Sequence, residues 1–357
     1  MFEELISKNT YKNTSSKGAV RVKLITLLSI IMFACSMGGC RKETPIFNTG
    51  RKASLSKIKS YANVYQEYDE EDLEKLKRFD IVVLEPYDVP DKKFLSELKS
   101  SGTIVLAYVS IGEADNERRY WEGWKPSDDA PDNPAIPRTT VTQDDSMFIG
   151  EDPGWEGSYF VDASNPKWHK ILLNEEIPYI LWLGGGKYDG LMMDVIDVVD
   201  EYEGYPDGSE MRKGMVDLIK EIREKYPELL LVPNRGFGIL SEMAPYIDAF
   251  KFEEMTSAYG NIEGEPDYGK YYLKIDERGD RENQEEIDLL VSVLKKHPMP
   301  VLVLDHIQTN PPDEKMARKC FEEAKRLERE TGFKFVWYGN SIDQDLPIWP
   351  FLALKKK

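Results

Sequence analysis

The sequence predicts an α/β protein: a single (β/α)8 TIM barrel with long loops at the C-terminal face of its strands. Strand-like apolar runs alternate with helical patterns from residue 80 to residue 338, which is typical of a parallel sheet. Eight such runs are present, the number that closes a barrel. A doubly wound open sheet is the alternative. However, the turn after the first run reads Glu85-Pro86-Tyr87-Asp88 and lacks the glycines of a phosphate-binding turn.

The predicted strands comprise residues 80–85, 103–109, 158–162, 188–194, 229–234, 247–253, 300–305 and 333–338. Helices are predicted over 91–99, 209–225, 239–245, 284–296 and 313–331. Asn165 and Pro166 begin a further helix, as an N-cap and an N1 proline. The stretch 115–157 is polar and rich in Trp and Pro, and it is too long for an ordinary connection, so we expect a functional loop there.

Composition is that of a globular protein with a core, since 41% of the 357 residues are hydrophobic and 31% are charged. The formal net charge of -17 argues against nucleic acid as a partner, because phosphate binding needs a basic surface. An acidic surface is compatible with a cationic substrate, although it commonly serves solubility alone. We expect a monomer that binds a polysaccharide substrate.

The N-terminus predicts export. Arg21 and Lys23 precede an apolar run, 24–34, that is too short for an ordinary membrane span. Met37-Gly38-Gly39-Cys40 then resembles a bacterial lipobox. We therefore expect a signal peptide at 1–39, a lipid on Cys40, a tether at 40–60 and the glycosidase-like domain at 61–357, anchored on the extracellular or periplasmic face of a membrane. An uncleaved anchor helix is the alternative.

Polar residues follow nearly every predicted strand. They are Glu85, Asp88, Tyr108, Ser110, Glu113, Asp162, Asp194, Asp197, Asn234, Arg235, Glu253, Glu254, Asp305, His306, Tyr338 and Asn340. A helix N-cap would explain Asp162, and it would also explain Asp88, but caps do not explain the whole set. Strand ends meet at the mouth of a barrel, where active sites form. A carboxylate ending the apolar strand 188–194 is costly unless it is paired or used, so we predict Asp194 to be half of a catalytic pair.

Side-chain alternation suggests its partner. In Phe250-Lys251-Phe252-Glu253, Lys251 and Glu253 share one face. If both Phe residues meet the helix layer, Glu253 points into the barrel mouth with Lys251 beneath it. Paired carboxylates suit glycoside hydrolysis. Aromatic residues near the strand ends favour a carbohydrate cleft, because sugar rings present apolar C–H faces to them: Tyr108, Trp121, Trp124, Trp155, Tyr159, Tyr259, Trp337 and Tyr338.

A metal site is the chemical alternative, with Asp194, Asp197 and Asp200 as oxygen ligands. His169 and His306 are too few for a typical zinc site. Cys320 is the one cysteine that would remain besides the lipidated Cys40, which excludes a disulfide framework in the mature domain. Nucleophile-elbow, Walker and dinucleotide motifs do not occur, so we expect neither a metal nor a cofactor.

Four segments are similar to the motifs of one barrel family, in the same order along residues 75–350. They are Ala-Tyr-Val-Ser-Ile-Gly-Glu-Ala from Ala107, Asp-Gly-Leu-Met-Met-Asp from Asp189, Pro-Asn-Arg-Gly from Pro233 and Phe-Glu-Glu from Phe252. The chain thus resembles the secreted glycosidases related to glycoside hydrolase family 114, the endo-α-1,4-polygalactosaminidases. The resemblance implies Asp194 and Glu253 as catalytic carboxylates, with Glu113, Tyr108, Asn234 and Asp305 lining the site. Position relative to the strand ends adds Asp88, Tyr338 and Trp155 as substrate contacts.

The resemblance implies an exported glycosidase that cleaves an amino-sugar-rich, polygalactosamine-like polysaccharide with retention. Its carboxyl groups would then lie about 5–5.5 Å apart. We assign Asp194 as nucleophile and Glu253 as acid/base, roles that could be exchanged. Lys251 stands where the family usually has an apolar residue, and a cation there would favour an ionised Glu253, which argues against a proton donor. A non-catalytic carbohydrate-binding lipoprotein on the same barrel is the alternative function.

Overall fold

The computed structural model describes residues 55–201, 208–260, 269–276, 279, 281–342 and 345–355. The chain divides into two units, 1–46 and 47–357, and the fold concerns the second. The predicted signal peptide, the lipidation site Cys40 and most of the tether lie outside the described residues. Within the described part, no helix combines the length and the hydrophobicity needed to cross a membrane.

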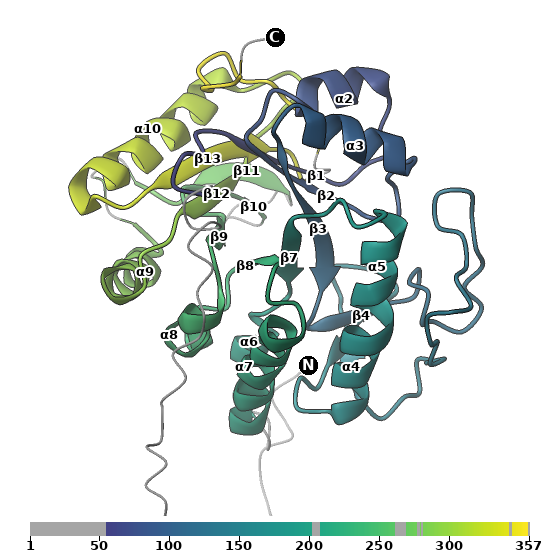
Figure 1. Ribbon diagram of the computed structural model, residues 1–357. Coiled ribbons are helices and arrows are strands. Elements are labelled where there is room, and N and C mark those ends of the chain that lie inside the picture. Colours follow the sequence, from purple (N-terminus) through teal and green to yellow (C-terminus); the bar gives the residue numbers. More distant parts are fainter. Residues whose placement is uncertain are drawn as a thin grey trace, which may run out of the picture. The chain divides into compact units, whose positions relative to one another are not determined.

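Eight parallel strands form two hydrogen-bonded sheets (Figure 1). The larger has the order β1-β2-β3-β7-β8 and the smaller β13-β12-β9. Their bounds are β1 Tyr61–Val64, β2 Ile81–Leu84, β3 Ile104–Ser110, β7 Gly190–Asp194, β8 Leu230–Pro233, β9 Phe250–Glu253, β12 Val301–His306 and β13 Phe335–Asn340. Because all ladders in these sheets are parallel, the carboxyl ends within each sheet lie along one edge.

The two sheets adjoin without a continuous ladder between them. An isolated parallel bridge joins Asn234, directly after β8, to Lys251 on β9. The backbone N–H groups of Leu231 and Arg235 point toward the β9 side. Leu231 N donates to the Asp248 carboxylate, and Arg235 N donates to the Lys251 carbonyl oxygen. Pro233, between them, has no N–H to donate, which limits pairing here. Among the described residues the hydrogen-bonded ring predicted from the sequence is therefore not closed, and the fold is an α/β arrangement of eight parallel strands.

The sequence prediction is wrong about one of these strands. Segment 158–162 forms β6 (Ser158–Val161), which pairs antiparallel with β4 (Glu113–Asp115) and β5 (Phe148–Glu151) in a separate sheet. The eighth parallel strand is instead β1, a four-residue segment whose polar Asn63 interrupts the apolar signal. Asn63 is buried, and its carbonyl accepts a hydrogen bond of 2.8 Å from the side chain of Asn340 on β13.

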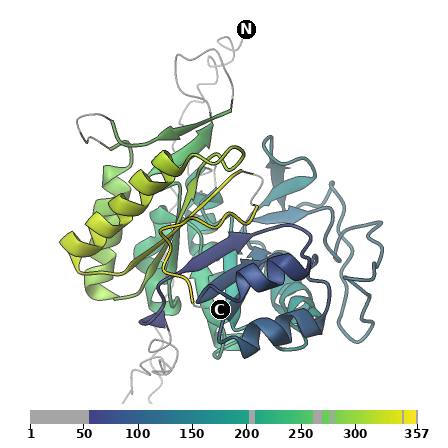
Figure 2. The same cartoon turned by 90° about the horizontal axis from the view of Figure 1, so that it is seen from above.

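Helices pack outside the strands. They are α2 Glu70–Leu76, α3 Lys92–Ser100, α4 Pro166–Ile171, α5 Ile177–Leu183, α6 Val198–Glu201, α7 Gly208–Lys225, α8 Leu240–Met243, α9 Gln284–Lys296 and α10 Glu314–Thr331. Figure 2 shows α2 and α3 side by side, across the strands from α10. Asn165 caps α4 by accepting from Lys167 N, as the sequence predicts. The hairpin of β10 (Ser257–Gly260) and β11 (Lys270–Leu273) extends beyond β9.

The predicted functional loop runs between β4 and β5 and is fixed to the fold by charged side chains. The buried Arg119 guanidinium donates to the carbonyl oxygens of Asn133, Ile136 and Pro137. Glu175 accepts a 2.7 Å hydrogen bond from the Thr139 hydroxyl. Glu175 lies in a π-helical turn, Leu172–Glu176, that joins α4 to α5 and turns two consecutive glutamates inward. The loop therefore forms an ordered wall beside the strand ends.

Candidate active site

A cavity of about 780 Å³ opens at the carboxyl ends of β3, β7, β8 and β9. It is lined by eight carboxylates and two guanidinium groups, together with aromatic and small side chains. The carboxylates are Glu85, Glu113, Asp115, Glu117, Asp152, Asp194, Asp197 and Glu253, and the guanidinium groups are Arg118 and Arg235. The concentration of acidic strand ends predicted from the sequence is thus present at one cavity.

Three neighbouring strand ends form its centre. Asp194 ends β7, Asn234 follows β8 and Glu253 ends β9. The Asn234 side-chain amide donates to Asp194 Oδ1 over 2.8 Å and to Glu253 Oε2 over 2.6 Å. These two distances together limit the separation of the accepting oxygens to 5.4 Å. A single amide therefore holds the two carboxyl groups side by side.

The backbone turns sharply directly after each of these three residues. Val195, Arg235 and Glu254 have φ angles of 58°, 54° and 57°, and they are the only non-glycine residues in the described part of the chain with positive φ. This left-handed conformation is costly for a residue with a Cβ, above all for a β-branched valine. Such strain persists where surrounding structure imposes it, and here it occurs at the strand ends that position the carboxylate–amide–carboxylate group.

Two cationic side chains contact Glu253. Lys251 Nζ lies 3.0 Å from Oε2, and His306 Nε2 lies 3.1 Å from Oε1. Burial alone would raise the pKa of Glu253, but the charge of Lys251 and the hydrogen bond and charge of His306 outweigh it and hold the pKa well below its usual range. Despite its burial, His306 in turn has a raised pKa because of Glu253. Lys251 lies beneath Glu253 as the alternation of the sequence predicts.

Asp194 is affected in the opposite direction. Burial raises the pKa of Asp194 above its usual range, and the negative charge of Glu253 raises it further. The charge of Lys251 and the hydrogen bonds from Asn234 and Val195 N offset this only in part. The environment therefore shifts the two pKa values in opposite directions, so that Glu253 ionises before Asp194.

An ion pair and stacked rings form the wall across from these strand ends. Arg118 binds Glu85 through two hydrogen bonds of 2.6 and 3.0 Å, and its guanidinium lies over the ring of Tyr87 at 4.7 Å. The Tyr87 hydroxyl donates to Glu176, 3.1 Å from each carboxylate oxygen. Burial raises the pKa of Glu176 to about 7 and, less strongly, that of Asp88 to about 6.

The structure brings most of the predicted substrate-binding residues to the cavity, since Tyr108, Glu113, Asn234 and Trp155 line it. Trp155 is 60% exposed. Asp88 is not among the lining residues. It lies in a turn after Glu85, where the backbone N–H of Asp88 donates to the Glu85 carbonyl oxygen.

Asp305 and Tyr338 lie in the core, contrary to the sequence prediction. Asp305 is fully buried and accepts hydrogen bonds from Thr256 N, Ser257 N and Trp337 Nε1 at 2.6, 2.9 and 2.8 Å. Its carboxylate thus satisfies backbone amides at the start of the β10–β11 hairpin. Tyr338 is fully buried and packs edge-on against Tyr61. Both side chains are used for packing, and neither lines the cavity.

Sequence reasoning missed several lining residues. Tyr65 directly follows β1, and the others belong to the loop and to the small antiparallel sheet: Asp115, Glu117, Arg118, Asp152, Pro153, Ser158 and Phe160. One available signal was the charge run Asp115-Asn116-Glu117-Arg118 at the start of the predicted functional loop. The ion pair between Arg118 and Glu85 joins residues 33 positions apart, so sequence spacing could not predict it.

The aspartates considered as metal ligands are held by different arginines. Asp197 lies 3.1 Å from Arg235, and Asp200 lies 3.1 Å from Arg212. Across the described residues no group of three or more His, Cys, Asp or Glu side chains is arranged to hold a metal ion.

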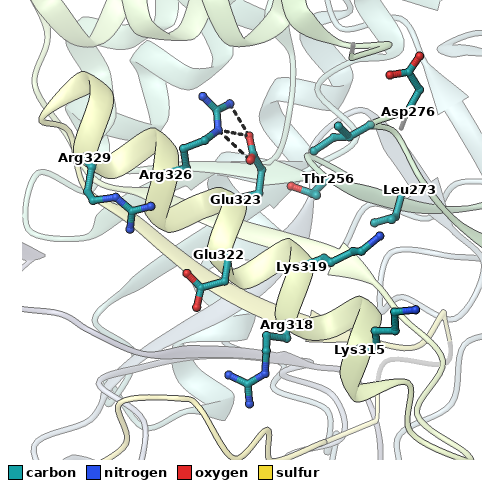
Figure 3. Close-up of a pocket in the computed structure, with 11 residues that line it drawn as sticks. Thr256, Leu273, Asp276, Lys315, Arg318, Lys319, Glu322, Glu323, Arg326 and Arg329 are labelled. Atoms are coloured by element: carbon teal, nitrogen blue, oxygen red, sulfur yellow. Dashed lines mark hydrogen bonds and ion pairs between the residues drawn. The ribbon is translucent and has the colours of Figure 1, made fainter. Parts of the chain in front are cut away.

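A second cavity, of about 620 Å³, lies between α10 and β11 (Figure 3). Figure 3 shows charged side chains of one face of α10 along it, among them Arg318, Lys319 and Arg326. Glu323 is bound here by both Arg326 and Arg281. The three carboxylates of this cavity, Asp276, Glu322 and Glu323, lie among five Lys and Arg side chains, and Glu323 is bound by two arginines, so we place the candidate active site at the strand ends instead.

Comparison with known proteins shows the family of the chain. A family model described as glycoside hydrolase family GH114 matches residues 49–337. An uncharacterized protein of Deinococcus radiodurans is 25% identical over 219 residues, which are 59% of this chain and 65% of that protein. Another, of Methanocaldococcus jannaschii, is 26% identical over 245 residues, 66% of this chain and 59% of that protein. The matched part of the chain thus spans less than two thirds of either relative.

Among solved structures, the glycoside hydrolase domain of PelA from Pseudomonas aeruginosa has a TM-score of 0.58 and 22% sequence identity. The similarity covers 81% of this chain and 96% of that domain. A variant of the same domain matches with the same TM-score and 21% identity. At this level of identity the likeness establishes the fold.

Proposed function

Because the chain belongs to glycoside hydrolase family 114, we propose that it hydrolyses glycosidic bonds with Asp194 and Glu253 as its two carboxylates. The observation that carries the proposal is the Asn234 amide, which holds one oxygen of each at 2.8 and 2.6 Å. Both carboxyl groups lie at the cavity, and their environments favour opposite protonation states. A protonated and an ionised carboxyl group side by side are what glycoside hydrolysis requires.

The separation supports a retaining mechanism. Carboxyl groups lie about 5–5.5 Å apart in retaining glycosidases and about 6.5–9.5 Å apart in inverting ones, which need room for a water molecule. The shared amide allows the nearest oxygens of Asp194 and Glu253 no more than 5.4 Å. This bound lies below the separation found in inverting enzymes, so a covalent glycosyl-enzyme intermediate is the route that the geometry favours.

The cavity charge supports an amino-sugar-rich, polygalactosamine-like polysaccharide as substrate. Eight carboxylates against two guanidinium groups attract protonated amines, because a cleft lined by one sign of charge concentrates the opposite sign. The exposed indole of Trp155 offers a flat apolar face to a sugar ring. A de-N-acetylated hexosamine polymer combines both features, a repeating cation and a repeating C–H face.

We also propose that the protein is exported and lipid-anchored through Cys40. The sequence supports this, since Arg21 and Lys23 precede the apolar run 24–34 and Met37-Gly38-Gly39-Cys40 resembles a lipobox.

The experiment is reducing-end release from partially deacetylated galactosaminoglycan by the wild-type protein, by Asp194→Asn and by Glu253→Gln. Each variant should lose activity by about 10²–10⁴-fold or more, the contribution of a positioned acid or base. Glu254→Gln is the matched control, because Glu254 follows Glu253 directly but pairs with Lys274 instead and does not line the cavity.

Full activity in either carboxylate variant, with unchanged thermal unfolding, would refute the assignment. A wild-type protein that binds the polymer without releasing reducing ends, and whose binding Asp194→Asn leaves unchanged, would instead identify a carbohydrate-binding protein on this scaffold.

A further inference from the structure

We infer that Lys251 and His306 are positioning residues that keep Glu253 ionised, so that Glu253 is the nucleophile and Asp194 the proton donor. This rests on the proposed function and reverses the roles assigned from the sequence. It follows from how hydrogen bonds are distributed over the four carboxylate oxygens, and from a buried cation that the function does not otherwise use.

Lys251 is 1% exposed and does not line the cavity, so it is not placed to touch substrate. Its neighbours on β9, Phe250 and Phe252, are buried on the opposite face of the strand and pack on Phe237. A buried ammonium is stable only with a charged partner, and Nζ lies 3.0 Å from Glu253 Oε2. Lys251 therefore acts on the reaction through Glu253.

His306 approaches the same carboxylate from the neighbouring strand. β12 pairs with β9 in parallel register, with Leu304 opposite Glu253, and His306 ends β12 two residues later. Its Nε2 lies 3.1 Å from Oε1, while Nδ1 is buried without a hydrogen-bond partner among the described residues. An N–H on Nε2 that donates to an ionised Glu253 satisfies this arrangement, and a protonated Glu253 would not accept this bond as well.

The oxygens of the two carboxyl groups are used unequally. Glu253 Oε2 accepts from both Asn234 and Lys251, whereas among the described residues Oε1 accepts from His306 alone and keeps a lone pair for attack. Asp194 Oδ1 accepts from Asn234 and from Val195 N. Within the described residues, Asp194 Oδ2 makes no such bond and is the oxygen available to carry the proton.

Other groups around Glu253 do not alter this distribution. On its cavity side are the carboxyl of Asp194 and the Arg235 guanidinium, which donates to the Glu253 carbonyl over 3.2 Å. Tyr61 and Tyr65 face it from β1, and both have pKa values raised well above their usual range, chiefly by burial, so they stay neutral. Glu254 is adjacent and pairs with Lys274 at 3.6 Å, and its Oε1 lies 4.0 Å from His306 Nε2, farther than Glu253 Oε1 at 3.1 Å.

The reaction balances with these roles. Glu253 Oε1 attacks the anomeric carbon, the bond from that carbon to the leaving oxygen breaks, and the leaving oxygen takes the bond's electron pair and the proton from Asp194. A water molecule then attacks the same carbon and gives one proton to Asp194. The bond to Glu253 breaks, and the Glu253 carboxylate is restored.

The test is a pH titration of ¹³C-carboxyl-labelled full-length protein by NMR, with the two signals assigned by Glu253→Gln and Asp194→Asn. In wild type, Glu253 should titrate below Asp194. Lys251→Met keeps the length of the buried side chain but removes its charge, and it should raise the Glu253 titration by about one pH unit or more, since an adjacent opposite charge lowers a carboxyl pKa by about 1–3. Lys251→Arg should restore it in part, and His306→Gln should raise it as well. Lys274→Met is the matched control and should leave it unchanged.

Asp194 titrating below Glu253 would overturn the inference, as would a Glu253 titration that is unchanged in both Lys251→Met and His306→Gln. The order of the two wild-type titrations decides the matter even if the Lys251 and His306 variants do not fold. The titration needs no substrate, so titrations as expected without any hydrolysis would refute the proposed function and leave the ionisation of Glu253 established. In active protein, the acid limb of kcat/KM against pH should move upward in Lys251→Met and stay in place in Lys274→Met.

Discussion

Replacement of Glu176 by glutamine should make the protein more stable at alkaline pH and change the pH dependence of its unfolding. Glu176 is 4% exposed and lies behind the cavity wall, where its carboxylate accepts from the Tyr87 hydroxyl. Its pKa rises from an ordinary 4.5 to about 7, chiefly because of burial; Arg118 and the Tyr87 hydrogen bond oppose the rise, and Glu85 and Asp115 add to it. At pH 8 the folded protein therefore holds a poorly solvated charge.

The sign and the size of this pH dependence follow from the linkage between proton binding and folding. The folded state binds this proton more tightly than the unfolded state, so the stability contribution is fully present below pH 4.5 and is lost as pH rises to about 7. Each pKa unit corresponds to about 1.4 kcal/mol, which gives a loss of about 3 kcal/mol between pH 4 and pH 8. Glutamine does not titrate. The unfolding free energy of Glu176→Gln minus that of wild type should therefore grow by about 3 kcal/mol over this range.

Urea unfolding at pH 4, 6 and 8 measures this difference, and any constant effect of the new amide cancels because only its change with pH matters. Exposed Glu285, in the first turn of α9, provides the control Glu285→Gln, which should show a nearly flat difference. A difference between Glu176→Gln and wild type that is equally flat would refute the reasoning, because Glu176 would then be as well solvated as a surface carboxylate.

Two further substitutions test the cavity. A Cβ at Gly112 would lie 1.8 Å from the carbonyl oxygen of Val195, directly after Asp194. Gly112→Ala should thus destabilise the protein by about 1–3 kcal/mol and reduce its activity. Gly260→Ala should do neither, because nothing lies within 4 Å of a Cβ at that position. Equal thermal unfolding of the two variants would contradict the close contact. Trp155→Ala should raise KM for the polymer by about 2–10-fold and leave kcat unchanged, because one stacking contact is lost. An unchanged KM would exclude stacking on this ring.

The backbone strain at the three strand ends lies directly beside the residues at the centre of the candidate site. Val195, Arg235 and Glu254 each reverse the chain directly after Asp194, Asn234 or Glu253. The left-handed turn ends the strand at the cavity and leaves the preceding side chain directed along it. Non-glycine residues in this conformation cost about 1–3 kcal/mol each, so the surrounding packing must impose it. Gly112 contributes by letting the Val195 carbonyl approach its backbone.

The sequence by itself determined the strand ends that carry the chemistry. Asp194, Asn234 and Glu253 each close an apolar run, and hydrophobic periodicity together with alternation placed them on neighbouring strand ends, with Lys251 under Glu253. These are local patterns, set within a few residues by the geometry of an extended chain. The same local reasoning could not tell strand 158–162, which pairs antiparallel in the wall, from β1, which pairs in parallel, because both are short and half polar.

Only the tertiary structure decided which polar groups face the cavity. Asp305, like Asp194, lies near the end of an apolar strand. Its carboxylate, however, accepts hydrogen bonds from the backbone amides of Thr256 and Ser257, whose position depends on a hairpin elsewhere in the chain. The opposite pKa shifts of Asp194 and Glu253 likewise depend on burial and on His306, 53 residues beyond Glu253. Electrostatic effects act through space at distances that sequence spacing does not encode, so ionisation states became readable only once the strands were assembled.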